Sequence, residues 1–226
     1  MALTLTKEIA NKEVKIMDNT FDFDFDFNEL FNTLDEEVKK DVKTFDDLLN
    51  YASSIDRELY LGSIDEGIGQ SLEGVIRFWN KIDDKNNIPA EQRKPIKIYI
   101  DSIGGSLTDS FTIIDAIEMS VTPVHTIITG RAYSGGFFVA IAGHKRIAYK
   151  HASFMYHEGS VSTGGDAGKF RNFADFYQKQ LGQLKEITLK YSNMTEEYYK
   201  EHQRDDLWLS ADEAKELGLV DIIVGE

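Results

Sequence analysis

The sequence predicts an α/β domain in which helices cover a mainly parallel β-sheet. Short runs of β-branched and aromatic residues alternate along the chain with longer segments whose apolar residues recur at helical spacing. Glycine or proline stands at many of the junctions between these two kinds of segment. Strands that alternate with helices usually pair in parallel, because the helix packs on the sheet while it carries the chain back to the starting edge.

The first half of the domain contains three expected strands and two expected helices. The strands are runs such as IKIYI and VHTIIT, and both helical segments carry apolar residues three and four positions apart. In chain order, the elements are a strand at 58–61, a helix at 68–82, a strand at 96–100, a helix around 111–117 and a strand at 124–129. Pro123 ends the second helix and Gly130 follows the third strand, as expected for residues that interrupt regular structure.

The second half begins with a short buried helix at 134–142, which Gly143 ends. Two short strands, RIAYK and ASFMYH, come next, and they are followed by a glycine-rich segment at 158–168 that is too flexible to form a helix. Aromatic and aliphatic residues from Phe170 to Tyr191 then recur at helical spacing. This pattern predicts a long helix that either packs on the core or contacts another subunit.

The C-terminal residues carry the signals of a short helix and a final strand. Ser210 and Glu213 have the spacing of a capping box, in which each side chain accepts a hydrogen bond from the backbone N–H of the other residue. Gly218 stands where that helix would end, and LVDIIV after it has the composition of a strand. These residues therefore complete the α/β domain.

Residues 1–54 differ from the rest and are expected to form an acidic N-terminal arm, followed by the α/β domain at 55–226. Phenylalanine and aspartate alternate strictly from Phe21 to Phe27, which is the period of a strand with one apolar face. The alternative is a solvated acidic arm with a short helix at 34–49. The sequence does not decide between the two, because the phenylalanines of an ordered arm would need a partner surface.

Composition excludes several classes of function. The chain has 226 residues and no cysteine, so disulfides, thiolate zinc sites and cysteine nucleophiles are excluded. A formal net charge of −14 without a basic cluster argues against nucleic acid as a partner. No HExxH pattern occurs and no expected helix carries two histidines four residues apart, so we expect no metal and no cofactor.

No membrane contact is expected either. No apolar run reaches the roughly 18 residues that a membrane-spanning helix needs. The N-terminal segment MALTLTKEIANKEVKIMDN also lacks the apolar stretch of a signal peptide. We therefore expect a soluble cytoplasmic protein.

Three glycine-containing segments, DSIGGS, GRAYSGG and MYHEG, combine groups that could perform acyl transfer. That chemistry needs a nucleophile, a base, a group that orients the base and N–H donors for the developing oxyanion. Ser134 lies at an expected strand-to-helix turn, where the first N–H groups of the helix are unpaired. Gly135 offers such an N–H without a side chain, and Gly104 and Gly105 lie at a similar turn.

Taken alone, each of these residues has a simpler structural explanation. A serine at a glycine-rich helix start is more often structural than catalytic, and any single histidine is more often an ordinary core or surface residue. The five histidines are His125, His144, His151, His157 and His202. The residues by themselves therefore leave both interpretations of Ser134 open.

Four blocks of the chain, IKIYIDSIGGSLTDSFTIIDAI, GRAYSGGFFVAIAGHKRIAY, SFMYHEG and RDDLWLSADEAKELGLVD, occur in the order expected for a known family. They resemble the proteolytic subunit of the Clp protease family. The blocks are similar to its strand–SPGGS–helix segment, its nucleophile segment, its histidine-ending strand and its LSA segment. The resemblance implies the ClpP/crotonase fold, with repeated β-β-α units and a protruding handle made of a strand and a long helix. The glycine-rich segment at 158–168 would supply that strand.

The resemblance assigns catalytic roles to three residues. Ser134 corresponds to the nucleophile, His157 to the general base and Asp206 to the acid that orients the base. Asp205 is the rival of Asp206 for this role, and Asp166 is a more distant one. The resemblance thus implies a serine endopeptidase that cleaves peptides or unfolded proteins inside an oligomeric ring chamber.

The resemblance also implies the remaining parts of the site and its partners. The backbone N–H groups of Gly105 and Gly135 would form the oxyanion hole. The family's handle pairs with extended peptide substrate and joins two rings face to face, which implies stacked homo-oligomeric rings. Residues 1–50 do not resemble the family's segment that engages an ATPase unfoldase, so that partnership stays open.

Departures from the family pattern keep other functions open. Ile103 replaces the usual proline of SPGGS. The SGG at the nucleophile resembles signal peptide peptidase A, a related fold with a serine–lysine dyad, and in that alternative Lys169 or Lys185 is the base. The remaining alternatives are an inactive ring subunit and a crotonase-type acyl-CoA enzyme.

Overall fold

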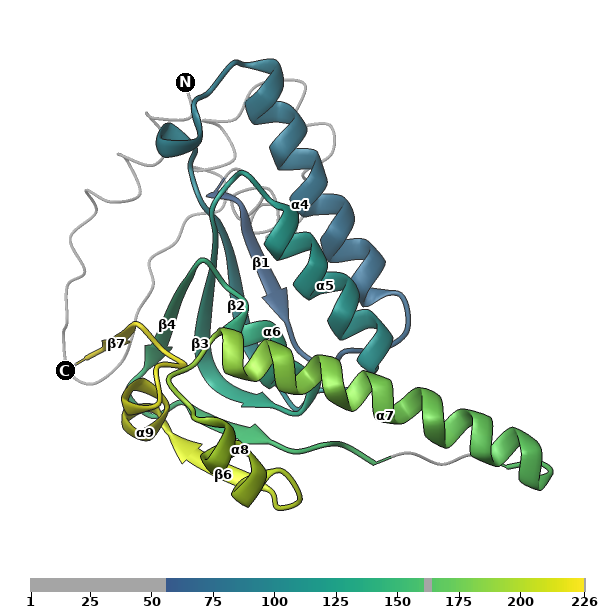
Figure 1. Cartoon of the computed structure of the whole chain (residues 1–226). Helices are drawn as coiled ribbons and strands as arrows, with labels where there is room; N and C mark the ends of the chain where they lie inside the picture. Colours follow the sequence, from purple (N-terminus) through teal and green to yellow (C-terminus); the bar gives the residue numbers. More distant parts are fainter. Residues whose placement is uncertain (1–55, 161–163, 226) are drawn as a thin grey trace, which may run out of the picture. The chain divides into compact units, whose positions relative to one another are not determined.

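A computed structural model describes residues 56–160 and 164–225 of the chain (Figure 1). The predicted acidic arm at 1–54, with its Phe/Asp alternation and its alternative helix at 34–49, lies outside these residues.

Strands and helices alternate along the described chain. The strands are β1 (Glu58–Leu61), β2 (Ile96–Ser102), β3 (Val124–Tyr133), β4 (Lys145–Tyr149), β5 (Ser153–Tyr156), β6 (Leu207–Ser210) and β7 (Ile222–Val224). The α-helices are α4 (Ile68–Lys85), α5 (Leu107–Met119), α6 (Gly135–Ile141), α7 (Ala167–Lys190), α8 (Glu196–His202) and α9 (Ala211–Glu216).

The strands of residues 56–160 and 164–225 form one seven-stranded sheet, in which β1, β2, β3, β4 and β7 lie side by side in parallel. Strand β3 changes partner along its length: residues 125–128 pair with β4, and residues 131–133 pair in parallel with β5. Strand β6 then adds to β5 in the antiparallel direction. This mostly parallel sheet with its helices confirms the predicted fold class.

The core lies between the sheet and the helices. Ile96, Ile98 and Ile100 of β2 are fully buried, and the residues that alternate with them face the other side of the sheet. The buried residues pack in one cluster with apolar residues of α4 and α5, among them Leu72, Ile76, Ile113, Ile114 and Ile117. All seven residues of α6, GGFFVAI, are buried as well, as expected for a helix that is apolar on every face.

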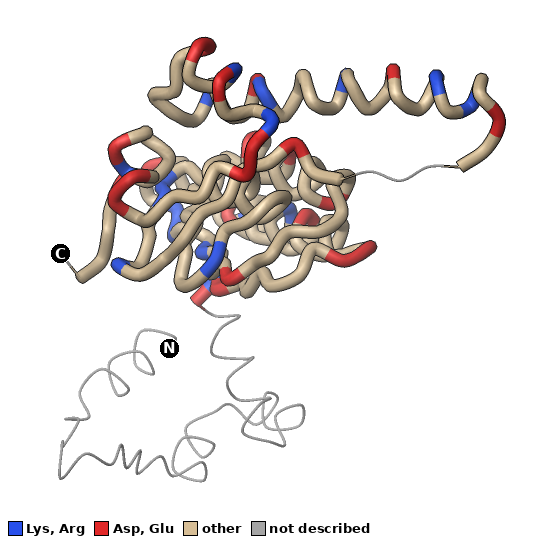
Figure 2. Tube along the Cα trace, turned by 90° about the horizontal axis from the view of Figure 1, so that it is seen from below, with Lys and Arg blue, Asp and Glu red and all other residues tan. Residues whose placement is uncertain are grey.

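Helix α7 has two halves with different environments. Its buried residues, Leu184 and Thr188, belong to the C-terminal half, whereas Phe170 and Phe176 in the N-terminal half are more than half exposed. Figures 1 and 2 both show the N-terminal half projecting beyond the sheet. One end of α7 therefore packs on the core and the other does not.

Several boundaries differ from the sequence prediction. Strand β3 continues through Gly130 to Tyr133, because its last residues gain a partner in β5. Strand β6 and helix α8 are not predicted from the sequence. The glycine-rich segment contains no strand at 158–160 or 164–166, and its residues 161–163 lie outside the described part of the chain. The predicted capping box at Ser210 and Glu213 is confirmed.

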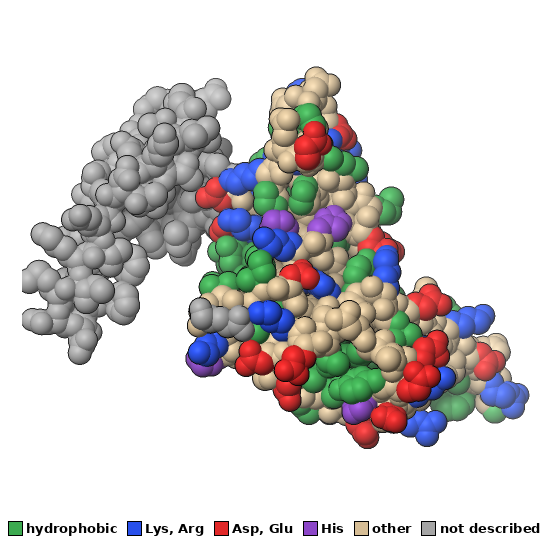
Figure 3. Space-filling view, turned by 60° about the vertical axis from the view of Figure 1, so that its left-hand side comes forward, with side chains coloured by type: hydrophobic (Ala, Val, Ile, Leu, Met, Phe, Trp, Pro, Cys, Tyr) green, Lys and Arg blue, Asp and Glu red, His purple; other side chains and the backbone are tan. Residues whose placement is uncertain are grey.

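Charged side chains of both signs are spread over the domain. On the face shown in Figure 3, basic and acidic groups lie interspersed with apolar ones, and Figure 2 shows both signs along α7. Among residues 56–160 and 164–225, no helix combines the length and hydrophobicity needed to span a membrane. In the same residues, no three His, Asp or Glu side chains come together as potential metal ligands.

Arg146 connects the ends of three elements to β4. Its guanidinium donates hydrogen bonds to the carbonyl oxygens of Tyr191, after α7, and Gly218, after α9, at 2.6 and 2.8 Å. It also donates to both carboxylate oxygens of Asp221, before β7. Burial by itself would raise the pKa of the Asp221 carboxyl, but the hydrogen bonds and positive charge of Arg146 lower the pKa below its usual 3.8.

We expect Asp221→Asn to lower the free energy of unfolding at pH 7 by about 1–2 kcal/mol, a range that allows for the partial exposure of the pair. Because the folded-state pKa of Asp221 lies below the unfolded one, its contribution is complete above the unfolded pKa and is lost as the pH falls through the folded pKa. Urea unfolding at pH 7 and pH 3 should therefore show a smaller difference between variant and wild type at pH 3. Asp84→Asn, at an exposed carboxylate beside Arg93, is the matched control and should cost less.

Candidate active site

Ser134 occupies a strained turn between β3 and α6. Its backbone φ and ψ are 53° and −124°, a positive φ that residues other than glycine rarely adopt. The turn is held at both ends, because the Ser134 N–H donates to the Met155 carbonyl at 2.9 Å and its own carbonyl accepts from Phe137 N–H at 3.0 Å. The conformation of Ser134 is therefore imposed by β5 on one side and by α6 on the other.

The imidazole of His157 lies between Ser134 and Asp206. Its Nε2 atom is 2.8 Å from Ser134 Oγ, within hydrogen-bonding distance. Its Nδ1 atom is 3.5 Å from Asp206 Oδ1, at the long limit for a hydrogen bond. The His157 and Asp206 side chains are 27% and 58% exposed, so the group opens to solvent on the side of Asp206.

The strand register explains why His157 and Asp206 lie close together. In the antiparallel ladder of β5 and β6, Met155 is opposite Trp208 and Tyr156 is opposite Leu207. One further step along the same ladder places His157, just after β5, opposite Asp206, just before β6. Among the described residues, the neighbouring Asp205 forms no hydrogen bond or ion pair with His157.

The backbone segments at Gly105 and Gly135 lie close to each other. The β-bridge with Ile64 uses the Gly104 carbonyl and the Ser106 N–H, so the N–H of Gly105 is outside that ladder. Gly135 is the first residue of α6, where an N–H has no partner within the helix. A Cβ atom added to Gly135 would lie 3.6 Å from the Gly105 nitrogen, which shows how near the two backbone segments are.

Close packing explains the glycines around Ser134. A Cβ atom on Gly104, where φ is +90°, would lie 2.7 Å from Ser134 Cβ. A Cβ atom on Gly136 would lie 2.8 Å from both Cβ and Oγ of the buried Ser102. The second glycine of the SGG sequence is therefore accounted for by its contact with β2.

The two lysines that would be the base in a serine–lysine dyad contact carboxylates rather than Ser134. Lys169 faces Asp166 at 3.9 Å near the start of α7, and Lys185 pairs with Glu196 at 3.1 Å. Asp166 itself caps α7 by accepting hydrogen bonds from the first N–H groups of the helix. Among the described residues, the basic group within hydrogen-bonding distance of Ser134 Oγ is thus the His157 imidazole rather than a lysine ammonium group.

Two other histidines have structural contacts. His144 Nδ1 accepts a hydrogen bond from the Val124 N–H at 3.0 Å, and burial lowers the pKa of this imidazole. His202 contacts the Tyr198 carbonyl through Nδ1 at 2.8 Å and stacks on the Tyr198 ring. These contacts account for both residues without a catalytic role.

Some residues that support the site are not found by sequence reasoning. Ser102 Oγ accepts a hydrogen bond from the Gly104 N–H at 3.0 Å and so shapes the turn beside Ser134. The Tyr177 hydroxyl on α7 donates to the Glu158 carbonyl at 2.6 Å and so ties the residue after His157 to the long helix. Neither contact has a local sequence signal, because both join residues whose proximity depends on the fold.

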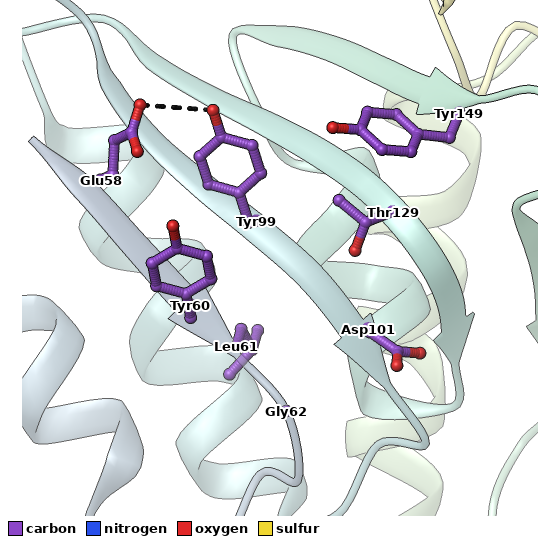
Figure 4. Close-up of a pocket in the computed structure, with 8 residues that line it drawn as sticks. All are labelled: Glu58, Tyr60, Leu61, Gly62, Tyr99, Asp101, Thr129 and Tyr149. Carbon is purple, nitrogen blue, oxygen red and sulfur yellow. Dashed lines mark hydrogen bonds between the residues drawn. The ribbon is translucent and has the colours of Figure 1, made fainter. Parts of the chain in front are cut away.

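A separate pocket lies on the outer face of β1 and β2, as Figure 4 shows. The rings of Tyr60 and Tyr99 stack there with their centroids 5.4 Å apart, and the Tyr99 hydroxyl donates to Glu58 at 3.3 Å. Tyr149 completes its aromatic lining. None of the residues that line this pocket belongs to the group around Ser134, so the two places are distinct.

Comparison with known proteins identifies the family. Residues 88–226 match the family model for Clp protease. The chain belongs to the Clp protease family. The resemblance found in the sequence is thereby confirmed.

Several relatives in the Clp protease family cover most of the chain. It is 32% identical over 177 residues to ATP-dependent Clp protease proteolytic subunit 3 of Synechococcus sp. (strain CC9605), with 75% of this chain and 83% of the relative covered. It is 31% identical over 177 residues to subunit 2 of Prochlorococcus marinus (strain MIT 9312), with coverage of 75% and 82%. The corresponding protein of Physcomitrium patens is 30% identical over 184 residues, with coverage of 80% and 88%.

Substitution of Gly136 should test the packing of the turn. We expect Gly136→Ala to lower the free energy of unfolding by about 1–3 kcal/mol, because the added methyl group overlaps buried Ser102. The matched control is Gly74→Ala in α4, where an added Cβ meets nothing within 4 Å. That variant should raise the free energy of unfolding by about 0.5–1 kcal/mol, because alanine favours the helix. Equal effects at the two sites in urea titrations would contradict the packing argument.

Proposed function

We propose that this member of the Clp protease family is a serine endopeptidase with Ser134, His157 and Asp206 as its catalytic triad. The observation that carries the proposal is the 2.8 Å separation between Ser134 Oγ and His157 Nε2. This is the geometry in which an imidazole can remove the hydroxyl proton as the oxygen attacks. The substrates would be peptides or unfolded proteins.

In the first step, His157 accepts the proton of Ser134 as Oγ attacks the carbonyl carbon of a peptide bond. The electrons of the C=O bond move to its oxygen, and the N–H groups of Gly105 and Gly135 stabilise the negative charge that develops there. One such donor contributes about 3 kcal/mol to transition-state stabilisation. When the intermediate collapses, the C–N bond breaks and His157 returns the proton to the leaving amine. Water then hydrolyses the acyl-enzyme with His157 again as base.

Asp206 would orient the imidazole by accepting a hydrogen bond from Nδ1–H. The Nδ1–Oδ1 distance of 3.5 Å is long for this contact. Catalytic hydrogen bonds in proteins without substrate are often long and shorten in the substrate complex. The role of Asp206 therefore requires only a small movement of the end of β6.

We expect an alkyl fluorophosphonate probe to label the purified protein and Ser134→Ala to abolish the labelling. Ser71→Ala, at an exposed serine on α4, is the matched control and should keep full labelling. In the same assay, Asp206→Asn should slow labelling by about 10³–10⁴-fold, as in other triads. Asp205→Asn should stay within about twofold of the wild type, because Asp205 is not in the ladder position opposite His157.

Other outcomes of the labelling experiment would support the alternatives. Labelling that survives Ser134→Ala would overturn the proposal. Labelling that depends on Ser134 and on Lys169 or Lys185, but not on His157, would indicate a serine–lysine dyad. An unlabelled protein that binds acyl-CoA would indicate a crotonase-type enzyme, and an unlabelled protein that only assembles with an active subunit would be an inactive ring component.

We propose further that the protein acts as a homo-oligomer of stacked rings. Phe170 and Phe176 are 56% and 55% exposed on the projecting half of α7, where they offer apolar surface to another subunit. The names of the relatives include the words ATP-dependent, so an ATPase unfoldase is the partner to test for this chain as well. A cytoplasmic location stays a prediction.

Substitution on α7 should test the assembly. We expect sedimentation velocity at micromolar concentration to show particles much larger than the 25.7 kDa chain. The double variant Phe170→Glu and Phe176→Glu should shift them to smaller species, because it places charge in an apolar contact. Gln178→Glu adds a charge at an exposed polar position of the same helix and should leave the particle size unchanged. A monomeric wild type would contradict the proposed rings.

A further inference from the structure

One row of side chains crosses the three strands whose ends adjoin the candidate triad residues. Tyr133 on β3 pairs with Met155 on β5, and Met155 pairs with Trp208 on β6. Residues paired across a sheet point to the same face, so the three side chains lie in one row. Met155 in the middle of the row is 9% exposed, whereas Trp208 is 57% exposed. The row is therefore open to solvent at its Trp208 end and buried in the middle.

The aromatic rings at the two ends of this row are in contact. The centroids of Tyr133 and Trp208 are 5.1 Å apart, and the ring planes make an angle of 81°, which is an edge-to-face contact. The Tyr133 hydroxyl also forms a 2.7 Å hydrogen bond with Ser153 Oγ on β5. A single side chain next to the nucleophile thus contacts both strands that lead to His157 and Asp206.

Strand β6 is held differently at its two ends. At its C-terminal end, Leu209 is buried and Ala211 begins α9 within the core. At its N-terminal end, Leu207 is only partly buried and Asp206 is mostly exposed. Trp208 lies two residues after Asp206 and therefore on the same face of the strand. Its ring contact with Tyr133 therefore lies close to the end of β6 next to Asp206.

We propose that Tyr133 and Trp208 form a positioning pair that keeps Asp206 within reach of His157. The inference rests on the proposed function, because it assigns the pair to the triad of that function. With Nδ1 and Oδ1 3.5 Å apart, a small displacement of β6 is enough to separate the carboxylate from the imidazole. Both rings act through Asp206 and take no part in the chemical steps.

The test is a comparison of peptide hydrolysis by the purified full chain and its variants. Trp208→Leu should lower kcat by about threefold to tenfold, the range that the energy of an aromatic pair allows, with KM within about twofold of the wild type. Trp208→Phe keeps a ring against Tyr133 and should restore most of kcat. When Asp206→Asn is already present, Trp208→Leu should cause no further loss, because the carboxylate on which it acts is gone.

Phe78→Leu is the matched control. Phe78 makes a similar edge-to-face contact with Trp79 on α4, with centroids 5.3 Å apart and planes at 72°, and is 53% exposed. Loss of that ring should leave kcat unchanged, because the pair lies on a helix that carries none of the triad residues. An equal loss of kcat in Phe78→Leu and Trp208→Leu would overturn the proposal, since it would indicate a general effect of removing an exposed ring.

Two further results would also overturn it. The first is a loss from Trp208→Leu that multiplies with that of Asp206→Asn. The second comes from crystal structures: we expect Trp208→Leu to lengthen the Nδ1–Oδ1 separation beyond the 3.5 Å of the wild type, and an unchanged separation contradicts the positioning role. If the wild-type protein neither hydrolyses peptides nor reacts with the probe, the proposed function fails, and the crystallographic comparison still decides whether the rings position Asp206.

Discussion

Strand β5 pairs with two partners, and the arrangement around Ser134 depends on both pairings. Its parallel ladder with β3 brings the Met155 carbonyl to the Ser134 N–H, at 2.9 Å. Its antiparallel ladder with β6 runs the other way, so that His157 after β5 faces Asp206 before β6. A slip of one residue in the second ladder would turn Asp206 to the opposite face of the sheet. The three side chains therefore come together only when both registers are correct.

The turn at Ser134 is a second constraint that the surrounding structure has to satisfy. A non-glycine residue at φ 53° costs on the order of 1–3 kcal/mol and persists only where neighbouring contacts impose it. Here the contacts are the hydrogen bonds at both ends of the turn and the fully buried helix α6. The glycines allow β2 and the loop after it to approach closely enough to provide this support. The tight packing around the turn thus maintains the strained conformation of Ser134.

Helix α7 links the long projecting segment to the candidate active site. Its C-terminal half packs on the core, its end is held by Arg146, and the Tyr177 hydroxyl is bonded to the Glu158 carbonyl beside His157. The helix that carries the proposed subunit contact is therefore also bonded to the residue next to the proposed catalytic base. The Tyr133–Trp208 contact connects β3, which ends before Ser134, with β6, which begins after Asp206.

Local patterns in the sequence determined most of the elements. The alternation of strands and helices and the capping box at Ser210 depend on neighbours along the chain, so they could be predicted without the fold. The four family blocks further predicted Ser134, His157 and Asp206 as a group. Only the tertiary structure decided that β3 continues past Gly130 and that β6 exists, with the predicted Asp206 opposite His157 in its ladder. These features depend on strand pairing between residues far apart in the chain, and local periodicity carries no information about which strands will pair or in what register.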